Sequence, residues 1–396
     1  MKDSISLLLG SGFSVSDGYP TGYKLNEFIS KIQYDDIILN SDGSAFIDIK
    51  DKYPNNWMSK PQRVFFERLL NYYKSIIKKK NREFDYEKFY DFYKNLQRNP
   101  EHDTGFKKLC EEYTQEYYPH FISNPRTYLL NFDTIYNQII QQKLTKRYKR
   151  SHIRWNGQGN YGQFLLMLES LSHQYKKINI HSLNHDLLME HLAFSDELPD
   201  KFCDGFTELG SPFYGRYKEE SMIRLQCFSD LFNKQLCLYK LHGSVDYVPF
   251  LDESGRLDII KTKPWISNIE LFKEVNDSNS NPSYYNYWAN YHSYFLTGTT
   301  EKINRYKEPF FSKMIDHFKI NLSQASGLII VGYGFKDRGI NESIEECLSV
   351  NSKVVVVDPY IKYSPVLRNY KTEYIRQEVS LINAGEVYKY FLSPNR

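Results

Sequence analysis

The feature that most constrains the fold is a series of short apolar runs, each of which ends at glycine or at small polar residues. The runs are 4–9, 178–183, 236–241, 327–331 and 353–357. Runs of this length that are apolar on both faces are typical of buried strands in a parallel sheet. Apolar residues at helical spacing over 25–32 and 164–171 predict helices between strands, with Thr21 as a helix N-cap. The sequence therefore predicts an α/β protein with a Rossmann-like parallel sheet and helices on both faces.

Residues 36–154 differ from this pattern, because apolar and aromatic side chains recur there at helical spacing. Aromatic residues make up 16% of the chain, and Tyr (34) and Phe (26) supply most of them. Many of these rings fall in 65–118, where we expect them to pack helices and to make subunit contacts. We therefore predict an all-helical insertion over 36–154, and one α/β domain built from 1–35 and 155–396.

Composition excludes several classes of protein. Lys and Arg number 51 against 48 Asp and Glu, so the net charge of +3 does not require a nucleic-acid partner. Two basic clusters, 78–82 and 146–154, are interpreted as solvated surface, with nucleic-acid binding and docking of a partner subunit as the alternatives. No apolar run approaches the roughly 18 residues of a membrane span, and the 5 cysteines form no CxxC pair. We expect a soluble, cytoplasmic protein without a zinc ribbon or other metal site.

Ligands of parallel α/β sheets bind beyond the carboxyl ends of the strands, and the polar clusters of this chain all lie at such ends. After the first run come Gly10, Ser11, Gly12 and Ser14, followed by Gly18 and Pro20. Glycines allow backbone N–H groups to approach a pyrophosphate, which the next helix N-terminus also favours. Val15 stands where the usual GxGxxG fingerprint has its third glycine, so a plain tight turn is the alternative.

The later strand ends supply the remaining candidate residues. They are Asn184, Asp186, His242, Gly332, Tyr333, Gly334 and Asp358. Each has a structural alternative: His242 as a buried core histidine, Asn184 as the cap of the next helix, and Asp358 as a turn residue. A second Asn-x-Asp pattern, 131–133, lies in a predicted helix without a preceding strand, so we prefer Asn184.

In this order the clusters resemble the sirtuin superfamily. The spacing of 10–20 is similar to its glycine-rich NAD loop, 182–186 to its Asn-containing strand end, and 241–243 to its Leu-His-Gly motif. The segments 332–334 and 357–359 resemble the strand ends that hold the adenosine half of NAD. The resemblance implies that NAD binds to Gly10, Ser11, Gly12, Ser14, Gly18, Pro20, Gly332, Tyr333, Gly334 and Asp358.

The departures from the superfamily point to one branch of it. Sirtuin deacylases carry two CxxC pairs and a Pro-Asp-Phe-Arg segment, whereas this chain has no CxxC pair and reads Pro-Thr-Gly-Tyr at 20–23. The chain looks more like the bacterial sirtuin-like effectors of phage defence, which hydrolyse NAD. A histidine titrates near neutrality, so His242 suits a general base. Asn184 would hold the ribose or the water, and Asp186 would orient the nicotinamide side or the loop.

The resemblance thus implies an NAD hydrolase that takes NAD as substrate, needs no metal, and depletes NAD in abortive infection. Such an activity harms the host unless it is gated, so we expect a homo-oligomer. At 396 residues the chain leaves little room for a sensor domain, which suggests a separately encoded ATPase or sensor subunit. The alternatives are an NAD-dependent protein deacylase and a non-enzymatic sensor that binds NAD or ADP-ribose.

Overall fold

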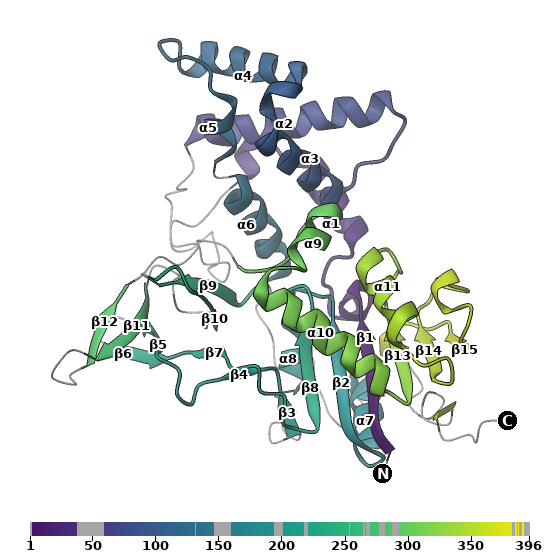
Figure 1. Ribbon diagram of the computed structural model, residues 1–396. Helices are drawn as coiled ribbons and strands as arrows, with labels where there is room; N and C mark the ends of the chain where they lie inside the picture. Colours follow the sequence, from purple (N-terminus) through teal and green to yellow (C-terminus); the bar gives the residue numbers. More distant parts are fainter. Residues whose placement is uncertain are drawn as a thin grey trace.

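The computed structural model describes residues 2–37, 59–130, 132–145, 160–193, 201–217, 221–252, 254–263, 266, 270–276, 282–286, 293–381, 385, 387, 390 and 391. Within them, seven strands form one sheet in the order β15-β14-β13-β1-β2-β8-β3, and every pairing is parallel (Figure 1). The strands are β1 (Lys2–Leu9), β2 (Tyr175–Ser182), β3 (Phe202–Cys203), β8 (Leu236–Lys240), β13 (Gly327–Val331), β14 (Lys353–Val357) and β15 (Lys371–Ile375).

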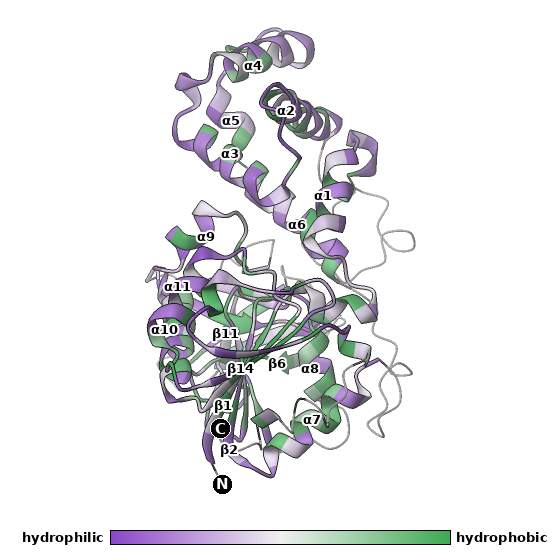
Figure 2. Ribbon diagram, turned by 90° about the vertical axis from the view of Figure 1, so that its right-hand side faces the viewer, coloured by the Kyte–Doolittle hydropathy of each residue, from purple (hydrophilic) through white to green (hydrophobic). Residues whose placement is uncertain are grey.

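Helices cover both faces of this sheet, because successive residues of each central strand point to opposite sides. In β1, Leu7 and Leu9 pack with α7 (Gly162–Ser172) and α8 (Leu188–Ala193). Leu8 packs on the other side with α10 (Pro309–Gln324) and α11 (Arg338–Cys347). The strands are accordingly the hydrophobic centre of this part of the molecule (Figure 2). The predicted Rossmann-like sheet with helices on both faces is confirmed.

A helical unit follows α1 (Gly22–Lys31), and we use this name for the described residues from 59 to 145. Its helices are α2 (Lys60–Lys79), α3 (Tyr86–Arg98), α4 (Thr104–Tyr117), α5 (Pro125–Leu129) and α6 (Phe132–Leu144). They stand at one end of the molecule, above the carboxyl ends of the strands (Figure 1). The exposed basic cluster at 78–82 lies at the end of α2, whereas the cluster at 146–154 lies outside the described residues.

Stacked and edge-on aromatic rings form the core of the helical unit. Phe89 is fully buried, and its ring lies within 6.3 Å of the rings of Phe66, Tyr73 and Phe132. The same core continues to Phe295, which lies outside the unit in sequence. The helix packing that the sequence predicted for these rings is therefore present.

Two antiparallel sheets, which the sequence analysis did not predict, occupy much of the segment between β3 and residue 285. In the described residues their orders are β4-β7-β10-β9 and β12-β11-β5-β6. The strands are β4 (Phe206–Thr207), β5 (Phe213–Tyr217), β6 (Ser221–Arg224), β7 (Gln226–Phe228), β9 (Tyr247–Leu251), β10 (Leu257–Lys261), β11 (Leu271–Asn276) and β12 (Pro282–Tyr285). These strands have two to six residues, and several include exposed or polar positions, so they lack the apolar runs by which buried parallel strands are recognised.

We predict that Phe89→Ala lowers the free energy of unfolding by about 3–5 kcal/mol, because it leaves a cavity among closely packed rings. Chemical denaturation followed by circular dichroism measures this change. The control is Tyr23→Ala, which truncates a ring that is 76% exposed, and it should change the stability by no more than about 0.5 kcal/mol. Equal destabilisation by the two variants would contradict the packing described above.

Candidate functional site

The central strands of the large sheet end at one level. Leu9 of β1 lies in register with Ser182 of β2 and Val331 of β13, and the next strands outward end with Lys240 and Val357 at the same height. β1 is flanked by β2 on one side and by β13 on the other, so the chain order reverses between β1 and β13. Such a switch point is where ligands bind in parallel α/β sheets. The structure therefore brings the candidate residues from five strand ends to one edge.

The glycine loops after β1 and β13 interlock at this switch point. Gly12 N donates a hydrogen bond to Gly332 O at 2.9 Å. Gly332 has φ of +62°, and a Cβ atom built on it would lie 2.4 Å from Phe13 N. A Cβ atom on Gly10 would lie 2.5 Å from Gly332 O. These glycines are thus required for the close approach of two chain segments, and the Gly12 N–H group is already bonded within the protein.

The rest of the first loop is a 3-10 helix, Ser11–Asp17, which ends at Gly18. Gly18 has φ of +78°, and its N–H group bonds Val15 O at 2.7 Å. Pro20 then leads into α1, whose N-cap is Thr21: its Oγ1 accepts a hydrogen bond from Lys24 N at 3.2 Å. The N-cap predicted at Thr21 is confirmed.

Asn184 joins the end of β2 to the first glycine loop. Its Nδ2 donates to Gly10 O at 2.9 Å and to the buried Ser14 Oγ at 3.0 Å. The side chain therefore faces the loop and does not cap α8. Asp186 bonds that helix instead, because its carboxylate accepts from Leu188 N at 3.0 Å. Burial raises the pKa of Asp186.

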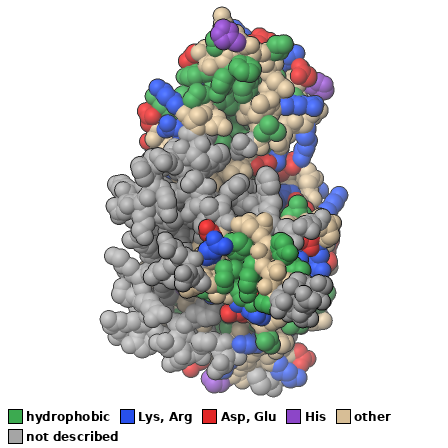
Figure 3. All heavy atoms as spheres, turned by 90° about the vertical axis from the view of Figure 1, so that its left-hand side faces the viewer, with side chains coloured by type: hydrophobic (Ala, Val, Ile, Leu, Met, Phe, Trp, Pro, Cys, Tyr) green, Lys and Arg blue, Asp and Glu red, His purple; other side chains and the backbone are tan. Residues whose placement is uncertain are grey.

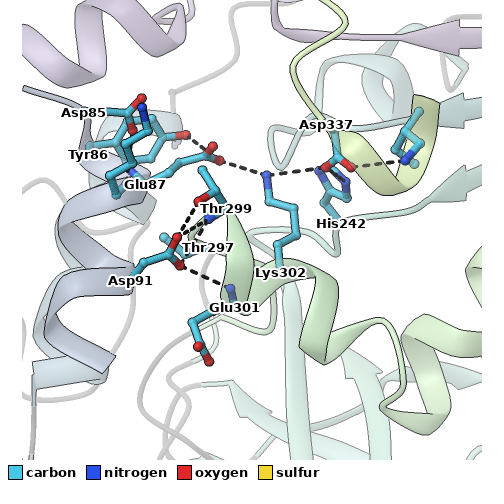
Figure 4. Close-up of polar contacts among 12 residues, drawn as sticks. Asp85, Tyr86, Glu87, Asp91, His242, Thr297, Thr299, Glu301, Lys302 and Asp337 are labelled. Atoms are coloured by element: carbon cyan, nitrogen blue, oxygen red, sulfur yellow. Dashed lines mark hydrogen bonds and ion pairs between the residues drawn. The ribbon is translucent and has the colours of Figure 1, made fainter. Parts of the chain in front are cut away.

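His242 follows β8 and is only 4% exposed. Its Nε2 lies 3.3 Å from Asp337 Oδ2 (Figure 4). The same Nε2 lies 2.8 Å from the Tyr306 hydroxyl, which donates to Asp337 Oδ2 at 3.0 Å. Burial lowers the pKa of His242, and the Lys302 ammonium lowers it further, although Asp337 acts in the opposite direction. The imidazole is therefore neutral at pH 7, which is the protonation state that a general base needs.

Three residues around His242 were missed by the sequence analysis: Lys302, Tyr306 and Asp337. Asp337 is the N-cap of α11, because its Oδ1 accepts from Ile340 N at 3.1 Å. An Asp just before a helical pattern is a recognisable N-cap signal, so this residue could have been found. Its pKa is lowered despite burial, because His242 and Lys302 stabilise the carboxylate. No local pattern marks Lys302, whose Nζ lies 3.8 Å from Asp337 Oδ2.

The candidate residues that follow β13 and β14 are placed by contacts within the protein or leave open space. The Tyr333 hydroxyl bonds Asn341 Oδ1 at 2.8 Å, so its ring is directed at α11. Gly334 leaves open space, since a Cβ atom there would meet only Lys336 Cγ at 4.0 Å. Asp358 Oδ1 accepts from Tyr360 N at 2.8 Å, which gives this residue the turn role named above as its alternative. Contacts of these residues with NAD remain proposals.

The described residues contain no group of three or more His, Cys, Asp and Glu side chains that could hold a metal ion. The cysteines are free thiols, and Cys203 Sγ lies 3.4 Å from Cys237 Sγ. Of the other Asn-x-Asp pattern, Asn131 lies outside the described residues, and Asp133 in α6 is paired with Lys94. None of the described helices combines the length and the hydropathy that a membrane span requires.

Comparison with solved structures finds several matches, of which two are described here. One is the structure described as "Structural Basis for the Mechanism and Regulation of Sir2 Enzymes"; it shares 8% identity over 98% of this chain and 92% of the other, with a TM-score of 0.38. The second is described as "Crystal structure of a Sir2 homolog-NAD complex". It shares 10% identity over 98% of this chain and 91% of the other, with a TM-score of 0.40. Similarity at this level does not establish the activity of this chain. No family model and no curated protein matches it.

We predict that Gly332→Ala destabilises the protein by about 2–5 kcal/mol, because it adds left-handed strain and forces the interlocked loops apart. The matched control is Gly334→Ala in the same loop, where a Cβ atom finds open space. Thermal and chemical unfolding of the two variants measures the difference. A Gly332→Ala variant as stable as Gly334→Ala would contradict the interlocked geometry.

Proposed function

We propose that this protein cleaves NAD to nicotinamide and ADP-ribose. The observation that carries the proposal is that a buried, neutral His242 and an Asn184 fixed to the glycine loop follow the adjacent strands β8 and β2, at the edge of the sheet that holds the switch point. The resemblance of five strand-end segments to sirtuin motifs supports NAD as the substrate. The lack of CxxC pairs in the sequence favours hydrolysis over zinc-bearing deacylation.

The first step is the binding of NAD at the switch point. The interlocked loops after β1 and β13 lie at the switch point, and Gly334 of the second loop leaves open space beside them, where a pyrophosphate would lie against backbone. Asn184 uses its Nδ2 on Gly10 and Ser14, so its Oδ1 is the atom that accepts from a ribose hydroxyl or from water. This amide orients the substrate without adding a charge.

The second step is hydrolysis. The bond between C1′ of the ribose and the nicotinamide nitrogen breaks, and its electron pair neutralises the pyridinium ring. A water oxygen bonds to C1′, and its proton passes to His242. Because Nε2 faces the Tyr306 hydroxyl, which itself donates to Asp337, the neutral ring carries its hydrogen on Nε2 and accepts the proton at Nδ1.

The activity test is NAD turnover, followed by chromatography of nicotinamide and ADP-ribose, before and after candidate partner proteins are added. We predict that His242→Ala lowers kcat by about 10²–10⁴-fold, which is the usual contribution of a general base. Asn184→Ala should also lower kcat, because the ribose and water lose their orientation. His173→Ala, at an exposed position after α7, is the matched control and should leave turnover unchanged.

The rival functions give different results in the same assay. Intact NAD in every assembly, with His242→Ala identical to wild type, would overturn the proposal. Binding of NAD without turnover, unaffected by Asn184→Ala, would favour a sensor of NAD or ADP-ribose. Nicotinamide release that requires an acyl-lysine peptide would favour a deacylase.

We further propose that the enzyme acts in phage defence by NAD depletion and that assembly of identical subunits, with or without a separate ATPase or sensor protein, gates it. The helical unit supports this proposal with an apolar surface. Phe121, Ile122 and Leu130 are 72%, 96% and 68% exposed, and hydrophobic side chains gather at this end of the molecule (Figure 3). Large exposed apolar groups of this kind are typical of contact surfaces between proteins.

We predict that Ile122→Asp lowers the molar mass of the assembly, because it places a charge in an apolar contact. Size-exclusion chromatography with light scattering measures this mass. Leu209→Asp is the control, since Leu209 is 90% exposed but lies outside the helical unit. An unchanged mass for Ile122→Asp would exclude this surface from subunit contacts.

A further inference from the structure

Tyr306, which contacts His242, and Lys302, which contacts Asp337, depend for their positions on a helix of the helical unit. Lys302 belongs to α9 (Thr300–Arg305), and Tyr306 is the residue that caps the C-terminus of this helix. The N-terminus of α9 is held by Asp91 of α3, whose carboxylate accepts from Thr300 N at 2.9 Å and from Glu301 N at 3.2 Å. A six-residue helix is not stable on its own, so α9 relies on this contact for its position.

The close contact between Asp91 and the start of α9 requires a glycine at position 298. Gly298 has φ of +93°, and a Cβ atom on it would lie 2.4 Å from Asp91 Oδ1. The same two helices are also joined by Arg98, whose two terminal nitrogens bond the Glu301 carboxylate. The contact between α3 and α9 is therefore specific and is made by several groups (Figure 4).

A line of alternating charges runs from α3 to His242. Glu87 of α3 bonds Lys302 Nζ at 2.8 Å, and the same Nζ lies 3.8 Å from Asp337 Oδ2. The Lys302 side chain is 9% exposed, the Asp337 side chain 10% and the Glu87 side chain 25%. Charges that are this well buried are screened little by water, so the loss of one of them changes the electrostatic energy of the others.

Each charge in the line acts on His242 with a known sign. Lys302 lowers the pKa of His242, whereas Asp337 and Glu87 raise it. The other titratable groups that face the ring are the Tyr306 hydroxyl and His185, whose ring centroid lies 6.2 Å away. Burial lowers the pKa of His185 far below its usual range, so His185 is neutral at pH 7.

We propose that Glu87 and Lys302 are positioning residues for His242, so that the helical unit completes the candidate active site and can regulate it. The proposal rests on the proposed function for its consequence, since His242 is the base of that reaction. Glu87 is the nearer partner of Lys302, at 2.8 Å against 3.8 Å for Asp337, so Asp337 Oδ2 is left to bond Tyr306 and His242. If α3 moves away from α9, Lys302 loses its bond to Glu87 and the N-terminus of α9 loses its cap, Asp91. Both the orientation and the pKa of His242 then change.

The test is the titration of His242 in the full-length chain. Histidine labelled with ¹³C at Cε1 reports the protonation of each ring by NMR, and the His242 signal is the one lost in His242→Ala. Glu87→Gln should lower the midpoint of this titration by roughly 0.5–1 pH unit, whereas Lys302→Met should raise it by a similar amount. Lys302→Arg keeps the charge and should behave as wild type.

Arg98→Gln is the matched control, because it breaks another bond between α3 and α9 without a link to His242. Its midpoint should equal that of wild type. Where NAD is hydrolysed, the acid limb of the pH–kcat profile should move with the midpoint, downward for Glu87→Gln and upward for Lys302→Met. Circular dichroism identifies any variant that fails to fold, and Glu87→Gln alters the most exposed of the three charged side chains.

The outcomes separate the two proposals. Opposite shifts for Glu87→Gln and Lys302→Met support the positioning role, even if NAD is left intact and the proposed function fails. Unchanged midpoints in a folded Glu87→Gln variant overturn the positioning role, even if the wild type hydrolyses NAD. Equal shifts for Glu87→Gln and Arg98→Gln also overturn it, because they would reflect a general loosening between α3 and α9.

Discussion

The arrangement of the site depends on one close contact, in which the backbone of the loop after β1 meets the backbone of the loop after β13. The bond from Gly12 N to Gly332 O fixes these two strand ends to each other. Side chains at Gly10, Gly12 or Gly332 would separate them. Because Asn184 bonds the first loop and Asp337 follows the second, this contact also sets where the two halves of the site lie.

Much of the sheet could be predicted from the sequence, since its information is local. The runs at 327–331 and 353–357 correspond to β13 and β14 residue by residue, because buried parallel strands are apolar on both faces. Five strand ends carrying polar clusters then had to share one edge, as parallel strands require. The small antiparallel sheets escaped prediction because β4 and β7 are two and three residues long and take their stability from neighbours distant in sequence.

Only part of the candidate site could be predicted from local sequence. Asn184 and His242 stand beside strand ends, where a motif can be recognised. Lys302 and Glu87 are 215 residues apart in the chain, and only tertiary packing makes them partners. Tyr306 is likewise brought to His242 by tertiary packing alone. Its ring occupies the space left by Gly339, since a Cβ atom on Gly339 would lie 2.7 Å from the Tyr306 ring.

The aromatic core of the helical unit is thereby linked to the candidate site. Its rings hold α3 and α6 together, and α3 in turn caps α9, from which Tyr306 reaches His242 and Lys302 reaches Asp337. A second contact runs from α6, where Gln141 donates to the carbonyl of Val245, three residues after His242. A buried imidazole with so few degrees of freedom responds strongly to small displacements of its charged neighbours, since the interior screens them weakly. The positioning role proposed for Glu87 and Lys302 would therefore couple packing in the helical unit to the protonation of His242, although the two regions are separate in sequence.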